Sequence, residues 1–330
     1  PAGFNQIGIK EVSMRGLFSS KANTVQVGVD FMPKGVAVVK VATGKKDLGQ
    51  VLLSAFLPAV GDSEQAKVLH QWVEKNKLTK APCVSLIARH DVQMFQLEKP
   101  AVDDAAELLQ AVTWKIKDLI NFDVETAVVD VFQLPPSPKN PKKYLNAVVA
   151  NQSVVGAYVD KIKQSGLKLE AINIHDLVNK NLCKVYDFTE QTIAVLQFSE
   201  TTSLMNIYHN EDMYVARDFK IGLLEIESAM DSDAAETGGI EQEEPVYDSL
   251  LLEVQRSMDY FESSYGLGMV KKVLVFPRSP ATERMLNYLQ NYVGFEFDFA
   301  EVVAHENAED IPLDTHCFSA YCASLRGAGA

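Results

Sequence analysis

The sequence predicts an α/β protein of two similar lobes, and three observations support this prediction. First, 330 residues with 47% hydrophobic content are enough for two cores. Second, the run VQVGVDFMPKGVAVVKV, residues 25–41, is typical of two strands joined by a tight turn, with Asp30 beside the bend. Third, residues 192–219, TIAVLQFSETTSLMNIYHNEDMYVARDF, repeat the order of strand, polar bend and strand, with Gln197 in the place of Asp30. Such a duplication predicts two like domains that face each other across a cleft.

Composition excludes several classes of function. The 31 basic and 44 acidic residues give a net charge of -13, and no basic stripe is visible, so we expect no nucleic-acid partner. No stretch approaches the roughly 18 to 20 apolar residues that a membrane helix needs, and no signal peptide opens the chain, so we expect no direct membrane insertion. The four cysteines are scattered, so we expect no metal site and reduced, buried thiols in a cytoplasmic protein: Cys83, Cys183, Cys317 and Cys322.

The first lobe is predicted over residues 25–188, with a small subdomain inserted at about residues 90–150. It follows an N-terminal extension, residues 1–24, which we interpret as partly vector-derived, with Met14 as a natural start. A Pro-rich basic segment, residues 135–143, is expected to be a solvated loop. The expected strands are 25–30, 36–41, 49–57, 84–88, 92–97, 126–134, 144–150 and 167–174, and the expected helices are 62–76, 103–120, 153–165 and 175–186.

The second lobe is predicted over residues 189–330, with a subdomain at about residues 223–268. The acidic segment 225–248 contains no basic residue and is expected to be a mobile, solvated loop. A helix of small residues at 315–326 is expected to return to the cleft and pack closely against a sheet. The other expected elements are a helix at 246–265, a buried strand at 270–276, a helix at 281–292 and an edge strand at 296–299.

Trp114 lies outside the apolar stripe of the predicted helix 103–120, about 180° from the centre of that stripe. One interpretation is contact with a neighbouring subdomain, because tryptophans are usually well buried. The other is an anchor for a protein partner, since tryptophan is enriched at binding hot spots.

Three bends follow buried strands, after VGVDF, VLQF and VLVF. In order and spacing they resemble the two phosphate loops and the adenosine loop of the actin, sugar kinase and Hsp70 superfamily. Within it the chain resembles the PilM family of type IV pilus machines, and most closely its members in MSHA pilus biogenesis. The resemblance implies an actin-like, ribonuclease H-like duplicated fold of two lobes with an FtsA/PilM-type inserted subdomain. It is carried by VGVDFMPKGVAVV, AVTWKIKDLINFDVETAVVDVFQL, VVANQSVVGAYVDKIKQSGLKLEAINI, LLLEVQRSMDYFESSY and ASLRG, spread over residues 25–327.

The bends depart from the pattern of a nucleotide-binding member, which has glycines that admit phosphate and carboxylates that hold Mg²⁺. The first bend keeps Asp30 but has Met32 in place of glycine, and the second and third, Gln197–Ser199 and Phe276–Ser279, contain no glycine. We therefore expect no catalytic residue and no ATP hydrolysis. Bound ATP with Mg²⁺ stays open, and the alternative is that the polar residues are simple turn formers. The residues of this degenerate nucleotide cleft are Asp30, Lys34, Gly35, Gln197, Ser199, Thr201, Thr202 and Arg278.

The resemblance implies a non-catalytic cytoplasmic scaffold that associates with the inner membrane through its partners. It would hold the cytoplasmic tail of a PilN-like single-span inner-membrane protein, with Trp114 as the contact, and the pilus assembly ATPase is a further implied partner. Two alternatives stay open. One is a nucleotide-binding protein or kinase of the same superfamily, with Asp130 and Asp123 as candidate bases. The other is a GspL-like secretion component, which is expected to continue into a membrane helix.

Overall fold

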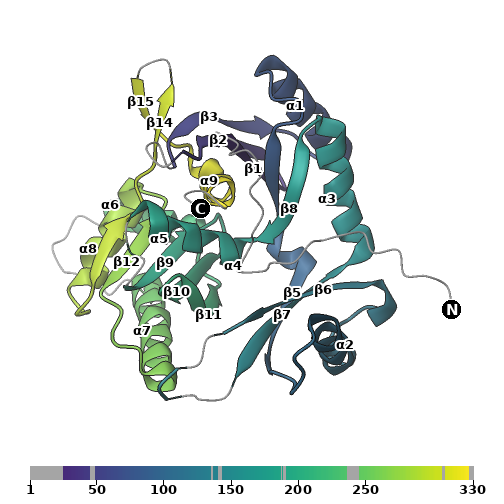
Figure 1. The fold of residues 1–330 in the computed structure, drawn as a ribbon. Helices are drawn as coiled ribbons and strands as arrows, with labels where there is room; N and C mark the ends of the chain where they lie inside the picture. Colours follow the sequence, from purple (N-terminus) through teal and green to yellow (C-terminus); the bar gives the residue numbers. More distant parts are fainter. Residues whose placement is uncertain are drawn as a thin grey trace. The chain divides into compact units, whose positions relative to one another are not determined.

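The computed structural model describes residues 25–44, 49–134, 137–139, 143–186, 188, 191–235, 245–306 and 309–326. The chain divides into two compact units (Figure 1). Unit 1 comprises the described residues up to 134, those from 143 to 178 and those from 304 onward, and unit 2 comprises residues 137–139 and 179–303. Within the described ranges, no helix has the length and apolar character required to cross a membrane. The predicted N-terminal extension lies outside the described residues.

Unit 1 is built on a seven-stranded sheet with the strand order β15-β14-β3-β2-β1-β4-β8. The hairpin predicted around Pro33–Gly35 is confirmed, because β1 and β2 pair antiparallel with Met32 opposite Gly35. β4 and β8 then continue the sheet in parallel with β1. The strands are β1 (Val25–Met32), β2 (Gly35–Ala42), β3 (Val51–Pro58), β4 (Pro82–Ile87), β8 (Lys168–Ile174), β14 (Val303–Glu306) and β15 (Glu309–Pro312).

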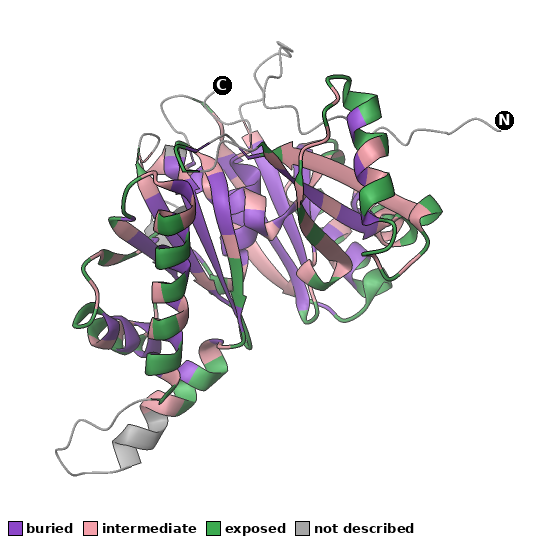
Figure 2. Ribbon diagram, turned by 90° about the horizontal axis from the view of Figure 1, so that it is seen from below, coloured by how far each residue is buried: buried purple, intermediate pink, exposed green. Residues whose placement is uncertain are grey.

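Helices cover both faces of this sheet, because side chains of a strand alternate between the two faces. α1 (Asp62–Lys75) and α3 (Gln152–Ser165) pack side by side (Figure 1), and their apolar residues share one core with Val27, Val29 and Phe31 of β1. α3 ends at Gly166, whose φ of 86° confirms the predicted left-handed cap. Figure 2 shows buried strands at the centre and exposed residues on the outer faces of the helices.

The opposite face of β1 is covered by α9 (Phe318–Ser324), the helix predicted from its small residues. Its backbone lies against Gly28, where an added Cβ would meet the Ala320 carbonyl oxygen and the Ser324 nitrogen. Gly28 therefore has no room for any side chain. This close approach confirms that the C-terminal helix packs tightly on a sheet, and the sheet belongs to unit 1.

A second, three-stranded sheet in unit 1 forms the inserted subdomain, with the order β5-β7-β6. Its strands are β5 (Val92–Glu98), β6 (Ala127–Gln133) and β7 (Tyr144–Asn151). α2 (Ala105–Ile116) begins at Asp104, whose carboxylate accepts hydrogen bonds from the amides of Ala106 and Glu107. The apolar stripe of α2 packs on one face of this sheet, on the side that carries Leu145, Ala147 and Val149 of β7.

Unit 2 repeats the strand arrangement of unit 1, with the order β11-β10-β9-β12-β13. Three consecutive antiparallel strands are followed by a strand parallel to the first, as in β1 to β4. This correspondence is the duplication that the two strand-bend-strand runs predict. The elements are β9 (Thr192–Phe198), β10 (Ser203–His209), β11 (Asp212–Phe219), β12 (Lys272–Phe276), β13 (Glu296–Phe299), α6 (Leu223–Ala235), α7 (Pro245–Tyr265) and α8 (Pro280–Gln290).

Two expectations about local structure were wrong, and one pair of strands was not predicted. The single helix predicted at 175–186 is split into α4 (His175–Val178), a 3₁₀ turn and α5 (Leu182–Val185), and the boundary between the units falls at that turn. The acidic segment is helical up to Ala235 because its apolar residues join the core of unit 2, and its centre, 236–244, lies outside the described residues. The neighbouring strands β14 and β15 were not among the elements predicted from the sequence.

The Pro-rich segment, expected to be a solvated loop, is described only at Ser137–Lys139, where Ser137 is buried and the next two residues are exposed. The amide of Lys139 donates to the carbonyl oxygen of Tyr265, and its Nζ donates to that of Glu262 at 3.1 Å. A lysine ammonium at the last turn of a helix interacts favourably with the unpaired carbonyl groups there. The segment is therefore attached to the end of α7.

The contact of α9 with β1 predicts the effect of a single methyl group. Gly28→Ala should lower the free energy of unfolding by about 1–3 kcal/mol or more, because the Cβ has no space and α9 must shift. The control is Gly156→Ala within α3, where no atom lies within 4 Å of the added Cβ, so stability should rise by up to about 1 kcal/mol. Thermal unfolding of both variants measures this. Equal melting of Gly28→Ala and the unaltered chain would contradict the packing.

Candidate functional site

The carboxylate of Asp30 at the first bend is buried and already has a hydrogen-bonding partner. Its Oδ2 lies 3.0 Å from Nε2 of His175, the first residue of α4. Burial disfavours a charged imidazole, but the nearby Asp30 carboxylate and its hydrogen bond outweigh it, so the pKa of His175 is raised. Arg89, bound to Asp176 at 3.1 Å, acts against this shift. The carboxylate that would face Mg²⁺ in a nucleotide-binding member of the superfamily thus lies against a histidine of the same unit.

The rest of the first bend is occupied by contacts within unit 1. Nε2 of Gln65 donates to the Met32 carbonyl oxygen at 2.8 Å. Gly35 lies against β3, where an added Cβ would meet the Leu57 carbonyl oxygen and the Phe56 ring, so this glycine serves strand packing. Lys34 is exposed at the turn. Of the three residues predicted here, Lys34 alone has its side chain on the surface.

The second bend closes on itself and caps a helix. The amide and the hydroxyl of Ser199 both donate to the carbonyl oxygen of Thr202, at 2.8 and 2.9 Å. The carbonyl oxygens of Ser199 and Glu200 accept the amides of Leu223 and Leu224, which begin α6. These polar residues act as the turn formers that the sequence left as an alternative.

Gln197, which replaces the second carboxylate of the superfamily pattern, belongs to an amide cluster in unit 2. Nδ2 of Asn179 lies 3.2 Å from its Oε1 and 3.4 Å from Oδ1 of the fully buried Asn206. Amides are neutral, so this cluster gives a divalent cation no charge to pair with. Gln197 lies opposite Phe276 in the parallel pair of β9 and β12. The second and third bends, which follow these two strands, therefore lie at the same end of the sheet.

Arg278 at the third bend is held by two carboxylates. Its Nε donates to Oε1 of Glu283 at 2.6 Å, and its Nη1 bonds to Glu301. These hydrogen bonds and charges raise the pKa of Arg278, so the side chain stays cationic but is already paired. Ser279 caps the first turn of α8, with its Oγ accepting from the Thr282 amide. The third bend therefore begins a helix and presents no glycine-lined adenosine site.

Trp114 is 68% exposed, so the interpretation that a neighbouring subdomain covers it is not supported. Nζ of Lys117 lies 5.4 Å from the ring centre, a cation–π contact on the same helix. The ring lies outside the stripe that α2 packs on the three-stranded sheet. Trp114 belongs to unit 1, as do Asp30, Lys34 and Gly35, whereas the other residues of the predicted nucleotide cleft belong to unit 2.

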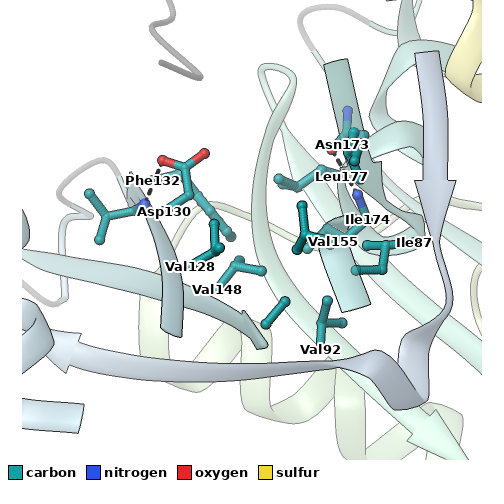
Figure 3. A pocket seen from close by; sticks show the side chains of 13 residues that line it. Ile87, Val92, Val128, Asp130, Phe132, Val148, Val155, Asn173, Ile174 and Leu177 are labelled. Carbon is teal, nitrogen blue, oxygen red and sulfur yellow. Dashed lines mark hydrogen bonds between the residues drawn. The ribbon is translucent and has the colours of Figure 1, made fainter. Parts of the chain in front are cut away.

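A groove in unit 1 was not predicted from the sequence. It lies on the face of the three-stranded sheet opposite α2, and β4, β8, α3 and α4 supply its other wall (Figure 3). Its volume of about 80 Å³ is well below the roughly 300 Å³ at which small-molecule sites begin, but suits a few aliphatic side chains. The lining residues are Ile87, Val92, Val128, Asp130, Val131, Phe132, Val148, Ala150, Val155, Ile172, Asn173, Ile174 and Leu177.

Two polar side chains line this otherwise apolar groove, Asp130 on β6 and Asn173 on β8 (Figure 3). Asp130, a candidate base of the kinase alternative, accepts the Val131 amide at 2.8 Å, and it is one of two carboxylates whose charge acts on Arg326. Asp123, the other candidate, caps a 3₁₀ turn by accepting the Glu125 amide. Neither carboxylate is on the strands that end at the three bends.

No protein-family profile and no curated protein sequence matches the chain. Among solved structures, the chain is similar to one described as the PilM-PilN type IV pilus biogenesis complex, with a TM-score of 0.66 and 14% identity over 92% of this chain and 99% of that one. The chain has the actin-like ATPase fold. The cytoplasmic domain of EpsL, an inner-membrane component of the Vibrio cholerae type II secretion system, matches more weakly, with a TM-score of 0.45 and 11% identity over 82% of this chain and 96% of that one. The similarity with a TM-score of 0.66 confirms the predicted fold class.

The contact of Asp30 with His175 predicts how stability depends on pH. A histidine whose folded-state pKa is raised above 6.5 stabilises the fold fully below that pH, and this contribution is lost as pH rises through the raised value. His175→Gln should therefore have a lower melting temperature than the unaltered chain at acidic pH. The difference between the two melting temperatures should become smaller at alkaline pH. The control is His90→Gln, at a side chain that is 77% exposed. A gap that does not change with pH would show that the pair carries no net charge interaction.

Proposed function

We propose that this chain is a non-catalytic scaffold of a type IV pilus assembly machine, and that the groove of unit 1 holds the cytoplasmic tail of a PilN-like single-span inner-membrane protein. The groove is the observation that carries the proposal, because it is apolar, narrow and bordered by strands. The similarity in fold to a protein solved in a PilM-PilN complex supports the choice of partner.

Charge supports the same partner. Cytoplasmic segments next to membrane spans are rich in Lys and Arg, whereas this chain has a net charge of -13. The groove itself contains one carboxylate, Asp130, and apolar side chains that accept a hydrophobic segment. A short basic and apolar tail matches both properties.

The assignment to an MSHA-type machine rests on the sequence motifs between residues 25 and 327. With it we propose a cytoplasmic location, peripheral to the inner membrane through the partner. Trp114 is proposed to contact a second component, such as the assembly ATPase, because α2 lies across the three-stranded sheet from the groove. This revises the role first expected for Trp114.

The nucleotide-binding and kinase alternatives have less support, because Asp30 and Arg278 are already paired and the bend at Ser199 is closed by its own hydrogen bonds. The GspL-like alternative shares the fold. It would use the same groove for a different inner-membrane protein.

Tail binding is expected to depend on the groove. Phe132→Ala removes a large side chain from the groove lining and should weaken the affinity for a synthetic tail peptide of the PilN-like protein at least about tenfold, a loss of roughly 1.4 kcal/mol. Titration calorimetry with the full chain measures the affinity. Trp114→Ala is the matched control, since it removes a larger, exposed ring outside the groove and should leave the affinity unchanged. Absence of binding to the unaltered chain would overturn the proposed function.

Nucleotide is not expected to stabilise the protein. A ligand present at about 100 times its dissociation constant adds about 2.7 kcal/mol to stability, which shifts the melting temperature by a few degrees for a chain of this size. Thermal unfolding with millimolar Mg-ATP or Mg-ADP should show no such shift. A clear upward shift would favour the nucleotide-binding alternative, and loss of that shift in Asp30→Asn would locate the nucleotide at the first bend.

A further inference from the structure

Two loops of unit 1 bring exposed lysines together at one end of the seven-stranded sheet. One loop joins α1 to β4 and the other joins α3 to β8, and the two are hydrogen-bonded to each other. The amide of Lys80 donates to the Gly166 carbonyl oxygen at 2.7 Å, and the amide of Lys168 donates to that of Ala81 at 2.9 Å. α1 and α3, which pack side by side (Figure 1), therefore end next to each other. The lysines exposed there, which we call the basic end, are Lys75, Lys77, Lys80, Lys163 and Lys168.

Three carboxylates offset part of the charge of the basic end. The Asp160 carboxylate lies 3.8 Å from Nζ of Lys163. Glu170 makes the corresponding contact with Lys168 at 3.9 Å, and solvent weakens both contacts because they are exposed. Glu74 lies in the last turn of α1. The lysines still leave a local excess of positive charge in a chain whose net charge is -13. Charges more than about 8 Å apart are largely screened at physiological ionic strength, so the acidic remainder of the chain does not cancel this excess.

Lys75, Lys77 and Lys80 have no carboxylate partner within the described part of the chain. The backbone at two of them is also unusual. The angle φ is 56° at Lys77 and 65° at Lys80, in the left-handed region that suits glycine or asparagine. A charged side chain thus occupies two positions where it adds backbone strain, and strain of this kind is found mainly where a residue serves binding.

The array suits a diffuse negative surface rather than a single bound anion. Arginine is the side chain that binds an individual phosphate with two parallel hydrogen bonds, and the segments 75–81 and 163–168 contain none. The lysines also lie at the C-terminal ends of α1 and α3, where the helix dipole is negative and presents no free amides to a phosphate. Clusters of about four to eight basic residues are typical of surfaces that bind anionic phospholipids.

We propose that the basic end of unit 1 adsorbs to the surface of a membrane that contains anionic phospholipids. The contact is made by charge and not by insertion, because the large apolar side chains exposed in the described residues lie elsewhere. The amino-terminal ends of β4 and β8 would face the membrane, with the first bend at the opposite end of the sheet. This inference goes beyond the proposed function and does not depend on the groove. It gives the chain a second attachment to the membrane, beside its protein partner.

Cosedimentation with vesicles tests the adsorption. The full chain is mixed with vesicles of equal parts phosphatidylcholine and phosphatidylglycerol, or of phosphatidylcholine alone, and the bound fraction is measured over a series of salt concentrations. The chain should bind the anionic vesicles at low salt, and the affinity should fall steadily as salt rises. Equal binding to both kinds of vesicle, or binding that salt does not change, would overturn the proposal.

Removal of charge from the unpaired lysines locates the contact. Lys75→Gln, Lys77→Gln and Lys80→Gln in one variant should weaken binding to the anionic vesicles about a hundredfold, since each lysine near such a surface contributes about fivefold. Lys75→Arg, Lys77→Arg and Lys80→Arg in a second variant keep the charge and should bind as the unaltered chain does. Circular dichroism and thermal unfolding show that both variants fold. Equal weakening in the two variants would mean that charge is not what binds.

A matched control removes three exposed lysines at other places. It carries Lys143→Gln in the inserted subdomain, with Lys220→Gln and Lys271→Gln in unit 2. Its net charge equals that of the glutamine variant of the basic end, but its affinity should match the unaltered chain. An equal loss in the two variants would overturn the basic end as the contact. Tighter binding of the unaltered chain to a DNA duplex than to the vesicles would overturn the assignment to a lipid surface. Neither result bears on the groove, so the proposed function is tested separately.

Discussion

Burial of the Asp30 carboxylate is the constraint on which much of unit 1 depends. A buried carboxylate is costly unless a charged or hydrogen-bonding group faces it, and His175 supplies that group at 3.0 Å. His175 directly follows β8 and opens α4, so the pair ties the middle of the sheet to the strand that borders the groove. One contact therefore partners the carboxylate that would face Mg²⁺ in a nucleotide-binding member and fixes the start of α4, which helps to line the groove proposed for the partner.

The other two bends are occupied in the same manner, by groups of the chain itself. Ser199 and Thr202 close the second bend and their neighbours begin α6, while Ser279 begins α8 and Arg278 is bound by two glutamates. In each case a polar residue that resembles a phosphate ligand instead closes a turn, caps a helix or forms an ion pair within the chain. An actin-like fold can in this way keep its duplicated sheets and serve as a docking scaffold.

Much of the fold was predictable because the patterns that specify it are local. Alternating and β-branched runs located most strands of the three sheets. The small residues of 315–326 indicated a helix that approaches a sheet closely, as Gly28 and Ala320 show. The duplication was visible as two similar runs. The break at Asn179 was not, because the periodicity of residues 175–186 is continuous and the split depends on where the two units divide.

The candidate sites were harder to predict because they depend on contacts distant in the sequence. Residues 30 and 175 are partners although they lie far apart in the sequence, and the glutamates that bind Arg278 come from α8 and from the segment between β13 and β14. The groove is lined by residues of β4, β5, β6, β7 and β8. In the sequence, the apolar residues of each of these strands are typical of a buried core strand. The one signal available was the isolated carboxylate of Asp130 within the apolar run AVVDVF.

Hydrogen–deuterium exchange over the full chain tests the central claim, that this fold binds a protein tail in the groove of unit 1 and not a nucleotide at its bends. Exchange would be followed with no addition, with the tail peptide and with Mg-ATP. The account predicts slowed exchange at β6 and β8 with the tail and no change anywhere with Mg-ATP. Slowed exchange by Mg-ATP at the bends near Met32, Ser199 and Arg278, with β6 unaffected by the tail, would contradict it.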